Sequence, residues 1–269
     1  MLARVLSVAG SDSGGGAGIQ ADIKTITALG GYAMTAITAL TAQSTRGVFG
    51  VVPTDPVFVE RQMRVVLDDI GADAIKTGML HDAALVATVA RVIRSLSARP
   101  KLVVDPVMVA KGGAPLLDDG AKGAVSSELL PLADVVTPNA PEAEALTGLA
   151  VEDEAGLRRA GERLLTLGAR AAYMKGGHLA GDRVVDVIVR ADGPEIVLSG
   201  PRLHTRSTHG TGCTLASALA VSLAQGLTLE EAARRAREYV VGAISAAPGL
   251  GAGHGPLDHG FVLRGGART

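Results

Sequence analysis

The chain lacks tryptophan and has only three tyrosines, three phenylalanines and one cysteine among its 269 residues. So few aromatic side chains argue against a surface that stacks the bases of single-stranded nucleic acid. A single cysteine excludes a disulfide within the chain and fits a reducing compartment. No apolar run approaches the roughly 18 residues of a membrane-spanning helix, and the first run, Val5–Ala9, is too short for the core of a signal peptide. We therefore expect a cytoplasmic protein without a membrane partner.

An excess of charge of either sign is missing as well, because the formal net charge is -1 at pH 7. Nucleic acid is therefore not favoured as a partner. Hydrophobic residues make up 47% of the chain, which is enough to bury a large core, and the length fits one large α/β unit. Glycine is abundant, with 35 residues, and many glycines follow short apolar runs. This placement indicates phosphate-type loops rather than disorder.

Short apolar runs alternate with amphipathic segments along the chain. The runs predict strands over Val5–Ala9, Ala33–Ala42, Val48–Pro53, Asp73–Met79, Lys101–Met108, Ala133–Thr137 and Ala171–Lys175. Helices are expected at about Ile19–Leu29, Pro56–Asp69, Asp82–Leu96, Asp119–Leu130, Asp153–Leu167 and Leu229–Ala246. Arg183–Val189 and Glu195–Ser199 flank Asp192-Gly193 and predict a β-hairpin. The alternation predicts a mostly parallel sheet covered on both faces and, without repeats or linkers, one domain over residues 1–269.

The stretch His209-Gly-Thr-Gly-Cys-Thr214 reads as a loop that turns directly into a helix over residues 215–225. Two glycines two positions apart let several N–H groups face one space, and a helix start adds unpaired N–H groups and the positive end of its dipole. Together they predict a site for phosphate or for a transferring phosphoryl group. Cys213 would sit at the helix start, where a thiol loses its proton more easily. The alternative is a glycine turn that caps a buried helix, with Cys213 as a small core residue.

A second glycine-rich loop, Gly10-Ser-Asp-Ser-Gly-Gly-Gly-Ala-Gly18, lies between the first strand and the first helix. Strand, loop and helix in this order are typical of a nucleotide or phosphate site. The loop nevertheless lacks the Gly-Lys-Ser/Thr ending of a P-loop and does not match GxGxxG. We therefore expect close backbone approach to a ligand of unspecified type, with a flexible connector as the alternative.

Polar residues stand at the ends of several predicted strands. Gln43 could hydrogen-bond the edge of a heterocycle through its amide, or it could be a surface residue. Asp105 ends a buried strand, a recurrent place for magnesium or a ligand in open α/β sheets. Glu142 follows Asn139 in a proline-stiffened turn at the same sheet edge, where the alternative is an Asn139 cap with a solvated Glu142. Lys175 is placed to act as a phosphate point charge, unless it is an ordinary surface lysine.

Five stretches in this order carry a resemblance to a known family. They are Gly10-Ser-Asp-Ser-Gly-Gly-Gly-Ala-Gly-Ile-Gln-Ala-Asp22, Asp105-Pro-Val-Met108, Thr137-Pro-Asn-Ala-Pro-Glu142, Met174-Lys-Gly-Gly-His178 and His209-Gly-Thr-Gly-Cys-Thr214. Over about residues 4 to 260 the chain resembles the hydroxymethylpyrimidine/phosphomethylpyrimidine kinases of thiamine biosynthesis, which are ribokinase-like. The resemblance implies a three-layer α/β/α sandwich. It also implies ATP-dependent, Mg²⁺-assisted phosphorylation of 4-amino-5-hydroxymethyl-2-methylpyrimidine, and then of its monophosphate to the diphosphate.

The resemblance also implies roles for individual residues. It places Asp22 and Gln43 at the substrate edge, and Gly10, Met79 and Val107 along the pyrimidine pocket. It places Asn139 and Thr208 at the nucleotide, Lys175 at the transferring phosphate, and Asp105 and Glu142 at the magnesium ion, through water because magnesium keeps much of its hydration shell. The remaining residues, Gly210, Thr211, Gly212 and Cys213, are implied to form the anion hole.

Three positions leave the carried-over site open. Asp12-Ser13-Gly14 stands where family members often have Asp-Pro-Ser-Gly, which leaves the loop's shape undecided. Arg237 stands where a lysine near the nucleotide is expected. Cys213 takes the place of an aspartate in the wider superfamily. We interpret Cys213 as the base that accepts the hydroxyl proton, with a pocket-lining role as the alternative.

Other readings of the function stay open too. Related kinases with this Gly-Thr-Gly-Cys loop act on vitamin B6, so a pyridoxal/pyridoxine kinase is the second candidate. A non-catalytic pyrimidine sensor is the third, although Asp105, Glu142 and Lys175 argue against it. A homodimer is left open as an assembly state.

Overall fold

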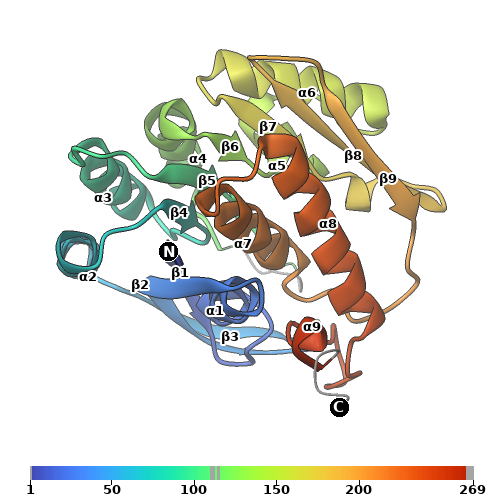
Figure 1. Cartoon of the computed structure of the whole chain (residues 1–269), viewed down its shortest axis with the longest axis horizontal. Coiled ribbons are helices and arrows are strands. Elements are labelled where there is room, and N and C mark those ends of the chain that lie inside the picture. Colours follow the sequence, from blue (N-terminus) through green and yellow to red (C-terminus); the bar gives the residue numbers. More distant parts are fainter. Residues whose placement is uncertain (1, 110–112, 114–115, 265–269) are drawn as a thin grey trace.

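Parallel strands form the centre of one sheet, and antiparallel strands form its edges (Figure 1). The computed structural model describes residues 2–109, 113 and 116–264. Its strands are β1 (Ala3–Asp12), β2 (Gly31–Ser44), β3 (Gly47–Pro53), β4 (Ala74–Thr77), β5 (Lys101–Val104), β6 (Val135–Val136), β7 (Ala171–Met174), β8 (Arg183–Arg190) and β9 (Ile196–Pro201). Their order in the described sheet is β3-β2-β1-β4-β5-β6-β7-β8-β9. The strands from β2 to β7 in this order run parallel, while β3 and the predicted β8–β9 hairpin pair antiparallel.

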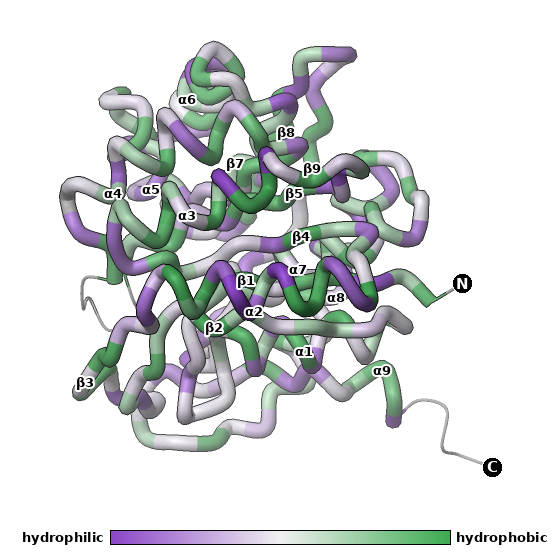
Figure 2. Tube along the Cα trace, turned by 90° about the vertical axis from the view of Figure 1, so that its left-hand side faces the viewer, coloured by the Kyte–Doolittle hydropathy of each residue, from purple (hydrophilic) through white to green (hydrophobic). Residues whose placement is uncertain are grey.

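Helices cover both faces of this sheet, which confirms the predicted three-layer α/β/α sandwich (Figure 1). One face is packed by α2 (Pro56–Asp69), α3 (Ala83–Arg94), α4 (Asp119–Ala124), α5 (Ala140–Thr147) and α6 (Glu154–Thr166). The other face is packed by α1 (Gly18–Ala28), α7 (Thr211–Ala224) and α8 (Leu229–Ser245), and α9 (Phe261–Arg264) follows them. Hydrophobic and hydrophilic segments alternate along the turns of the outer helices, as expected when one side of a helix packs on a sheet (Figure 2).

The helix α7 differs from the others because it is buried on nearly all sides. It packs against α1, α8 and the strands β1, β4 and β5. Its residues 214–222 are all buried, and they are mainly Ala, Leu and Ser. Small side chains of this kind allow a helix to lie close to its neighbours. The start of α7 is therefore held rigidly against the middle of the sheet.

Most element boundaries differ from the sequence predictions by a few residues, and three of the differences bear on the site. β5 ends at Val104 rather than Met108, because Pro106 cannot donate to a strand ladder. The helix predicted over Asp119–Leu130 is α4 followed by a π-helical turn, Val125–Leu129, and a 3-10 turn that contains Pro131. α7 begins at Thr211, four residues earlier than predicted, so that Cys213 lies in its first turn. Within the described residues, none of the helices has the length and apolar character needed to cross a membrane.

Candidate active site

The carboxyl ends of the parallel strands open onto one cavity of about 700 Å³. This is the edge at which ligands bind in open α/β sheets. Of the predicted site residues, those that line the cavity are Gly10, Gln43, Met79, Asp105, Val107, Asn139, Glu142, Lys175, Thr208, Gly210, Thr211, Gly212 and Cys213. These residues are far apart in the sequence but close in space, because β1, β2, β4, β5, β6 and β7 all end at this edge of the sheet. Asp22 is the predicted site residue that does not line it.

The first turn of α7 forms one wall of the cavity. Gly210 precedes it in the left-handed conformation, with φ of 85°. A Cβ atom at Gly210 would overlap the carbonyl oxygen of Gly16, so this position requires glycine for both space and conformation. The N–H groups that follow have no intrahelical acceptor, as at any helix start. The predicted anion site therefore has the expected local geometry.

Lys175 joins this wall to the two predicted metal carboxylates. Its Nζ lies 3.1 Å from Asp105 Oδ1 and 3.6 Å from Glu142 Oε2. Burial lowers the pKa of Lys175, but the charges of Asp105 and Glu142 raise it by more than burial lowers it. The pKa of Lys175 therefore lies above its ordinary value. Burial raises the pKa of Glu142. A permanent cation thus stands between two carboxylates at the mouth of the anion site.

Asp105 keeps an oxygen available for a further ligand. Its Oδ1 accepts hydrogen bonds from Thr137 and Lys175, whereas its buried Oδ2 has no hydrogen-bond partner among the described residues. The described residues contain no cluster of three or more His, Cys, Asp or Glu side chains that could hold a metal alone. Two carboxylates facing a phosphate site nevertheless fit magnesium, which is usually held by one or two carboxylates together with substrate phosphates and water.

The expected acidity of Cys213 is contradicted by its surroundings. Burial raises the pKa of the thiol to about 11, even though the charge of Lys76 lowers it. The helix start is therefore not enough to make Cys213 a thiolate near neutral pH in the free protein. The residue faces the cavity as predicted, but as a neutral thiol.

Asp22 is placed differently from the prediction. The Asp22 carboxylate is fully buried beneath the cavity, where it accepts hydrogen bonds from the hydroxyl groups of Ser7 and Ser217. Both of its oxygens also lie 2.9 Å from Lys76 Nζ. All of its surroundings are thus protein groups, which leaves it no edge toward a substrate. Lys76 lines the cavity in its place. Burial lowers the pKa of Lys76, but the charges of nearby acidic groups, that of Asp22 foremost, together raise it above its ordinary value. No spacing rule connects this pair, because Asp22 and Lys76 lie 54 positions apart.

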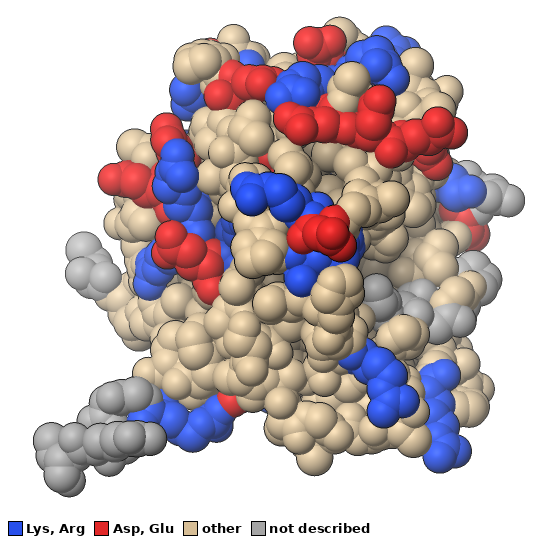
Figure 3. Space-filling model, turned by 90° about the vertical axis from the view of Figure 1, so that its right-hand side faces the viewer, with Lys and Arg blue, Asp and Glu red and all other residues tan. Residues whose placement is uncertain are grey.

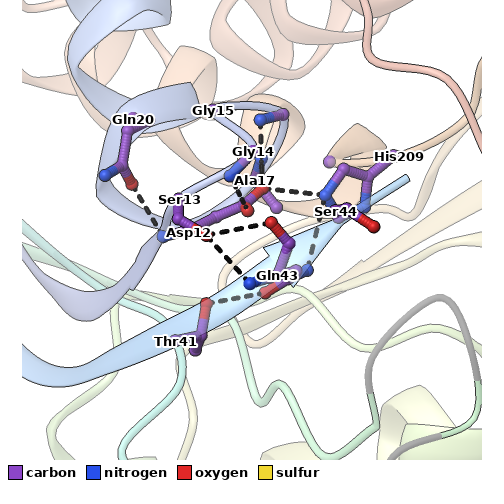
Figure 4. Close-up of polar contacts among 12 residues, drawn as sticks. Asp12, Ser13, Gly14, Gly15, Ala17, Gln20, Thr41, Gln43, Ser44 and His209 are labelled. Atoms are coloured by element: carbon purple, nitrogen blue, oxygen red, sulfur yellow. Dashed lines mark hydrogen bonds and ion pairs between the residues drawn. The ribbon is translucent and has the colours of Figure 1, made fainter. Parts of the chain in front are cut away.

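The first glycine-rich loop is folded around Asp12 (Figure 4). The carboxylate of Asp12 accepts hydrogen bonds from the N–H groups of Gly14, Gly16 and Ala17, and it lies 2.8 Å from His209 Nε2. Burial alone would raise the pKa of Asp12, but the hydrogen bonds from His209 and the backbone lower it below its ordinary value. The contact between Asp12 and His209 therefore ties the two glycine-rich loops together, and the loop is not a flexible connector. His209 was part of the motif, yet this partner could not be foreseen.

Beside this pair, Gln43 and a small apolar group form the opposite wall. Gln43 Oε1 lies 3.1 Å from the Thr41 hydroxyl, and Gln43 Nε2 lies 3.4 Å from His209 Nε2, so the amide is held at the cavity edge (Figure 4). Met79 packs with Ala39, and Val107 lies against them. An amide beside apolar side chains suits a flat ring with polar atoms on its edge.

Arg237 does not reach the cavity. Its guanidinium contacts the Asp186 carboxylate and donates to the Val184 carbonyl oxygen at 2.9 Å. The role of Arg237 was left open by the resemblance, and both of its contacts lie on β8.

Comparisons with known proteins agree with this geometry. The family model described as phosphomethylpyrimidine kinase matches residues 12–258. A hydroxymethylpyrimidine/phosphomethylpyrimidine kinase of Streptomyces coelicolor is 54% identical over 96% of this chain and 95% of its own length. The bifunctional thiamine biosynthesis protein ThiED of Geobacter sulfurreducens is 52% identical, but this chain spans only 52% of its length.

Solved structures repeat the fold. The pyridoxal kinase of Staphylococcus aureus in complex with pyridoxal has a TM-score of 0.90 and 36% identity, covering 98% of this chain and 96% of that one. A phosphomethylpyrimidine kinase of Clostridium difficile has a TM-score of 0.80 and 40% identity, covering 90% and 99%. Since the family model spans residues 12–258 and the Streptomyces coelicolor kinase is 54% identical over nearly the whole length of both chains, this chain belongs to the phosphomethylpyrimidine kinase family.

Proposed function

We propose that this chain, as one kinase domain, transfers the γ-phosphoryl group of ATP to the hydroxymethyl group of 4-amino-5-hydroxymethyl-2-methylpyrimidine, and then to the resulting monophosphate. The observation that carries the proposal is the convergence of two unlike walls on one cavity. The start of α7 with Lys175 suits a phosphoryl group, and Gln43 with Met79 and Val107 suits a small heterocycle. The names of the relatives support the same substrate.

ATP is the proposed phosphoryl donor. Related pyridoxal kinases have been solved with ADP and with AMP-PCP, and the cavity offers Asn139, Thr208 and Lys175 for the corresponding contacts here. A magnesium ion bound with the nucleotide would be held by Asp105 and Glu142, and it would neutralise charge on the phosphates. ATP as donor and a reduced Cys213 fit the predicted cytoplasmic location.

The protein's own contribution is mainly positioning and electrostatics. The N–H groups at the start of α7 and the Lys175 ammonium face the place where negative charge develops during transfer. The Gln43 amide orients the ring, and the apolar residues around it exclude water. Cys213 lies between these walls, where it could receive the hydroxyl proton once cations and ligand have changed its surroundings.

Pyridoxal is the second candidate substrate. The Staphylococcus aureus pyridoxal kinase shares the fold at 36% identity, whereas the pyrimidine kinase of Streptomyces coelicolor shares 54%. The higher identity favours the pyrimidine. A sensor without turnover is disfavoured, since Lys175, Asp105 and the α7 start are all in place.

We expect ADP release from ATP and magnesium with the pyrimidine alcohol and with its monophosphate, and slower release with pyridoxal. The measurement is a coupled ADP assay with the three acceptors side by side, and a reaction without acceptor serves as the control. Faster turnover of pyridoxal than of the pyrimidine alcohol would replace the proposed substrate. Pyrimidine binding without any ADP would favour the sensor.

Asp105→Asn and Glu142→Gln are each expected to raise the magnesium concentration needed for half-maximal turnover by about 10- to 100-fold, as loss of a ligand-shell group does. The reason is that each change removes a carboxylate charge from the proposed metal side. A magnesium titration of kcat at saturating ATP measures it. Glu144→Gln is the matched control, since this glutamate lies on α5 and accepts from the Val151 N–H outside the cavity. Titrations that overlay the parent's would reject the metal assignment.

A homodimer through the β3 edge of the sheet is the proposed assembly. β3 is a terminal strand, and an unpaired strand edge invites pairing. Phe49 and Val52 on β3 are 73% and 65% exposed, and Val57 and Phe58 at the start of α2 are 75% and 55% exposed. A second copy of the chain would cover this apolar surface. Sedimentation equilibrium tests it, and a monomer at micromolar concentration would contradict it.

A further inference from the structure

A buried carboxylate with no role in the proposed chemistry lies directly behind Lys175. Asp186 belongs to β8 and is 6% exposed. β7 pairs with β8 up to Met174 and Val187. Asp186 is the next residue of β8 beyond this last pair, and it lies opposite the residues that follow Met174 at the end of β7. The carboxylate therefore stands at the point where the chain leaves β7 for the active site.

The chain after Lys175 is held by this carboxylate. Gly176 begins a 3-10 turn, Gly176–His178, and its N–H donates to Asp186 Oδ1 at 2.9 Å. A Cβ atom at Gly176 would overlap the carbonyl oxygen of Val185, so the turn is pressed against β8. On its other side, the Lys175 N–H donates to the Pro138 carbonyl oxygen at 2.9 Å. The backbone at Lys175 and Gly176 is thus held on one side by β8 and on the other by the segment that follows β6.

The remaining oxygen of Asp186 is neutralised and oriented by two other groups. Oδ2 accepts from the Tyr173 hydroxyl at 3.1 Å and forms an ion pair with Arg237 of α8. Tyr173 is fully buried, and burial raises its pKa well above the ordinary value, so that its hydroxyl remains a donor. Arg237 is anchored in turn by the Val184 carbonyl oxygen. Each partner of the carboxylate is therefore itself held in place.

We propose that Asp186, with Arg237 as its counter-ion, is a positioning residue for Lys175. The carboxylate fixes the Gly176 N–H and thereby the direction in which Lys175 enters the anion site. This gives Arg237, whose role the resemblance left open, an indirect role: it holds Asp186, and Asp186 positions Lys175. The inference rests on the proposed function, since it concerns the lysine that contacts the transferring phosphoryl group.

A double-mutant cycle between Asp186→Asn and Lys175→Met tests the proposal. In the parent background, Asp186→Asn is expected to lower kcat by about 10- to 100-fold, the usual range for groups that orient a functional residue. KM for the pyrimidine should change by less than about twofold. In the Lys175→Met background, the same substitution should change kcat by no more than about twofold, the scatter expected when no further interaction is lost.

Two further sets of variants separate positioning from folding. Tyr173→Phe removes one donor from Asp186 with little change of volume, and it should give a smaller loss of kcat that also disappears in the Lys175→Met background. Arg237→Lys should recover part of the kcat lost in Arg237→Met, because it restores the positive charge. Arg234→Met is the matched control on the same helix, since Arg234 is 54% exposed and pairs with Glu230. Figure 3 shows that acidic and basic side chains are intermixed over the upper half of this side of the molecule, whereas the lower half is mostly uncharged.

Equal losses of kcat for Asp186→Asn in both backgrounds would overturn the positioning role, because the carboxylate would then act independently of Lys175. The same holds if Tyr173→Phe and Arg237→Met leave kcat at the parental value. A parent chain that releases no ADP with any acceptor would overturn the proposed function and this inference together. An active parent with an additive cycle would overturn the inference alone.

Discussion

Gly212→Asp is expected to lower kcat for phosphoryl transfer by at least about 10³-fold, because removal of a single anion-hole donor already costs about 10²- to 10³-fold. A Cβ atom at Gly212 would lie 3.2 Å from Lys175 Nζ and 3.7 Å from Asp105 Oδ2. The new carboxylate would therefore occupy the place of the phosphoryl oxygens and bind the lysine that should neutralise them. Stopped turnover with near-parental binding of the pyrimidine, measured by ADP release and calorimetry, is the expected pair of results.

Two other substitutions calibrate this result. Gly212→Ala adds only a methyl group against the flexible end of Lys175, so its loss of kcat should be smaller than that of the aspartate. Gly123→Asp places the same charge on α4, where a side chain would meet open space, and it should turn over like the parent. Parental kcat in Gly212→Asp would show that the start of α7 is not the anion site.

Cys213→Ala is expected to lower kcat by roughly 10²- to 10⁴-fold, the usual contribution of a general base, with little change in pyrimidine binding. Since burial raises the thiol pKa to about 11, the neutral thiol predominates at pH 7 and the thiolate fraction increases as the pH rises. The kcat/KM of the parent should accordingly rise with pH above neutrality. This rise should be absent in Cys213→Ala. The measurement is a pH–rate profile of both proteins.

Cys213→Asp provides the complementary test. A carboxylate is ionised at neutral pH, so this variant should recover part of the rate and lose the alkaline rise. For the same reason, the thiol of the parent should be alkylated more slowly than a free thiol at pH 7, which reverses the expectation from the helix start alone. An alanine variant with the parental rate and profile would leave Cys213 as pocket lining, and the anion site would be unaffected.

The sequence was sufficient to predict the layers of the fold, and all of the predicted site residues except Asp22 line the cavity. Periodicity identifies strands, and in a parallel sheet every strand end reaches the same edge, so Asp105, Glu142 and Lys175 could be grouped before any contact was known. Properties that depend on the third dimension could not be predicted in this way. The acidity of Cys213 follows a local rule in the sequence, but desolvation outweighs that rule in the structure.

Pairs of distant residues account for the remaining errors. Asp22 carries a motif position that implied substrate contact, yet Lys76 and Ser217 surround its carboxylate. Arg237 stands where a lysine near the nucleotide is expected, and its partner Asp186, 51 positions away on β8, could not be foreseen. In each case a charged side chain pairs with a group far away in the sequence, and no regular spacing of residues predicts such a pair. The helix predicted over Asp119–Leu130 is helical along its whole length, and only its type changes, from α to π and then to a 3-10 turn that contains Pro131.

The tie between Asp12 and His209 has a consequence for the synthesis of the chain. The two residues are 197 positions apart, and Asp22 and Ser217 are separated by 195. At about 5–20 residues per second, a ribosome delivers the imidazole roughly 10–40 s after the carboxylate. During that interval β1 and the first loop exist without α7, and their acidic groups lack partners that the native molecule provides. The nascent chain therefore reaches its native state only when its last quarter emerges. A chaperone would protect the chain most in the interval between the synthesis of Asp12 and that of His209.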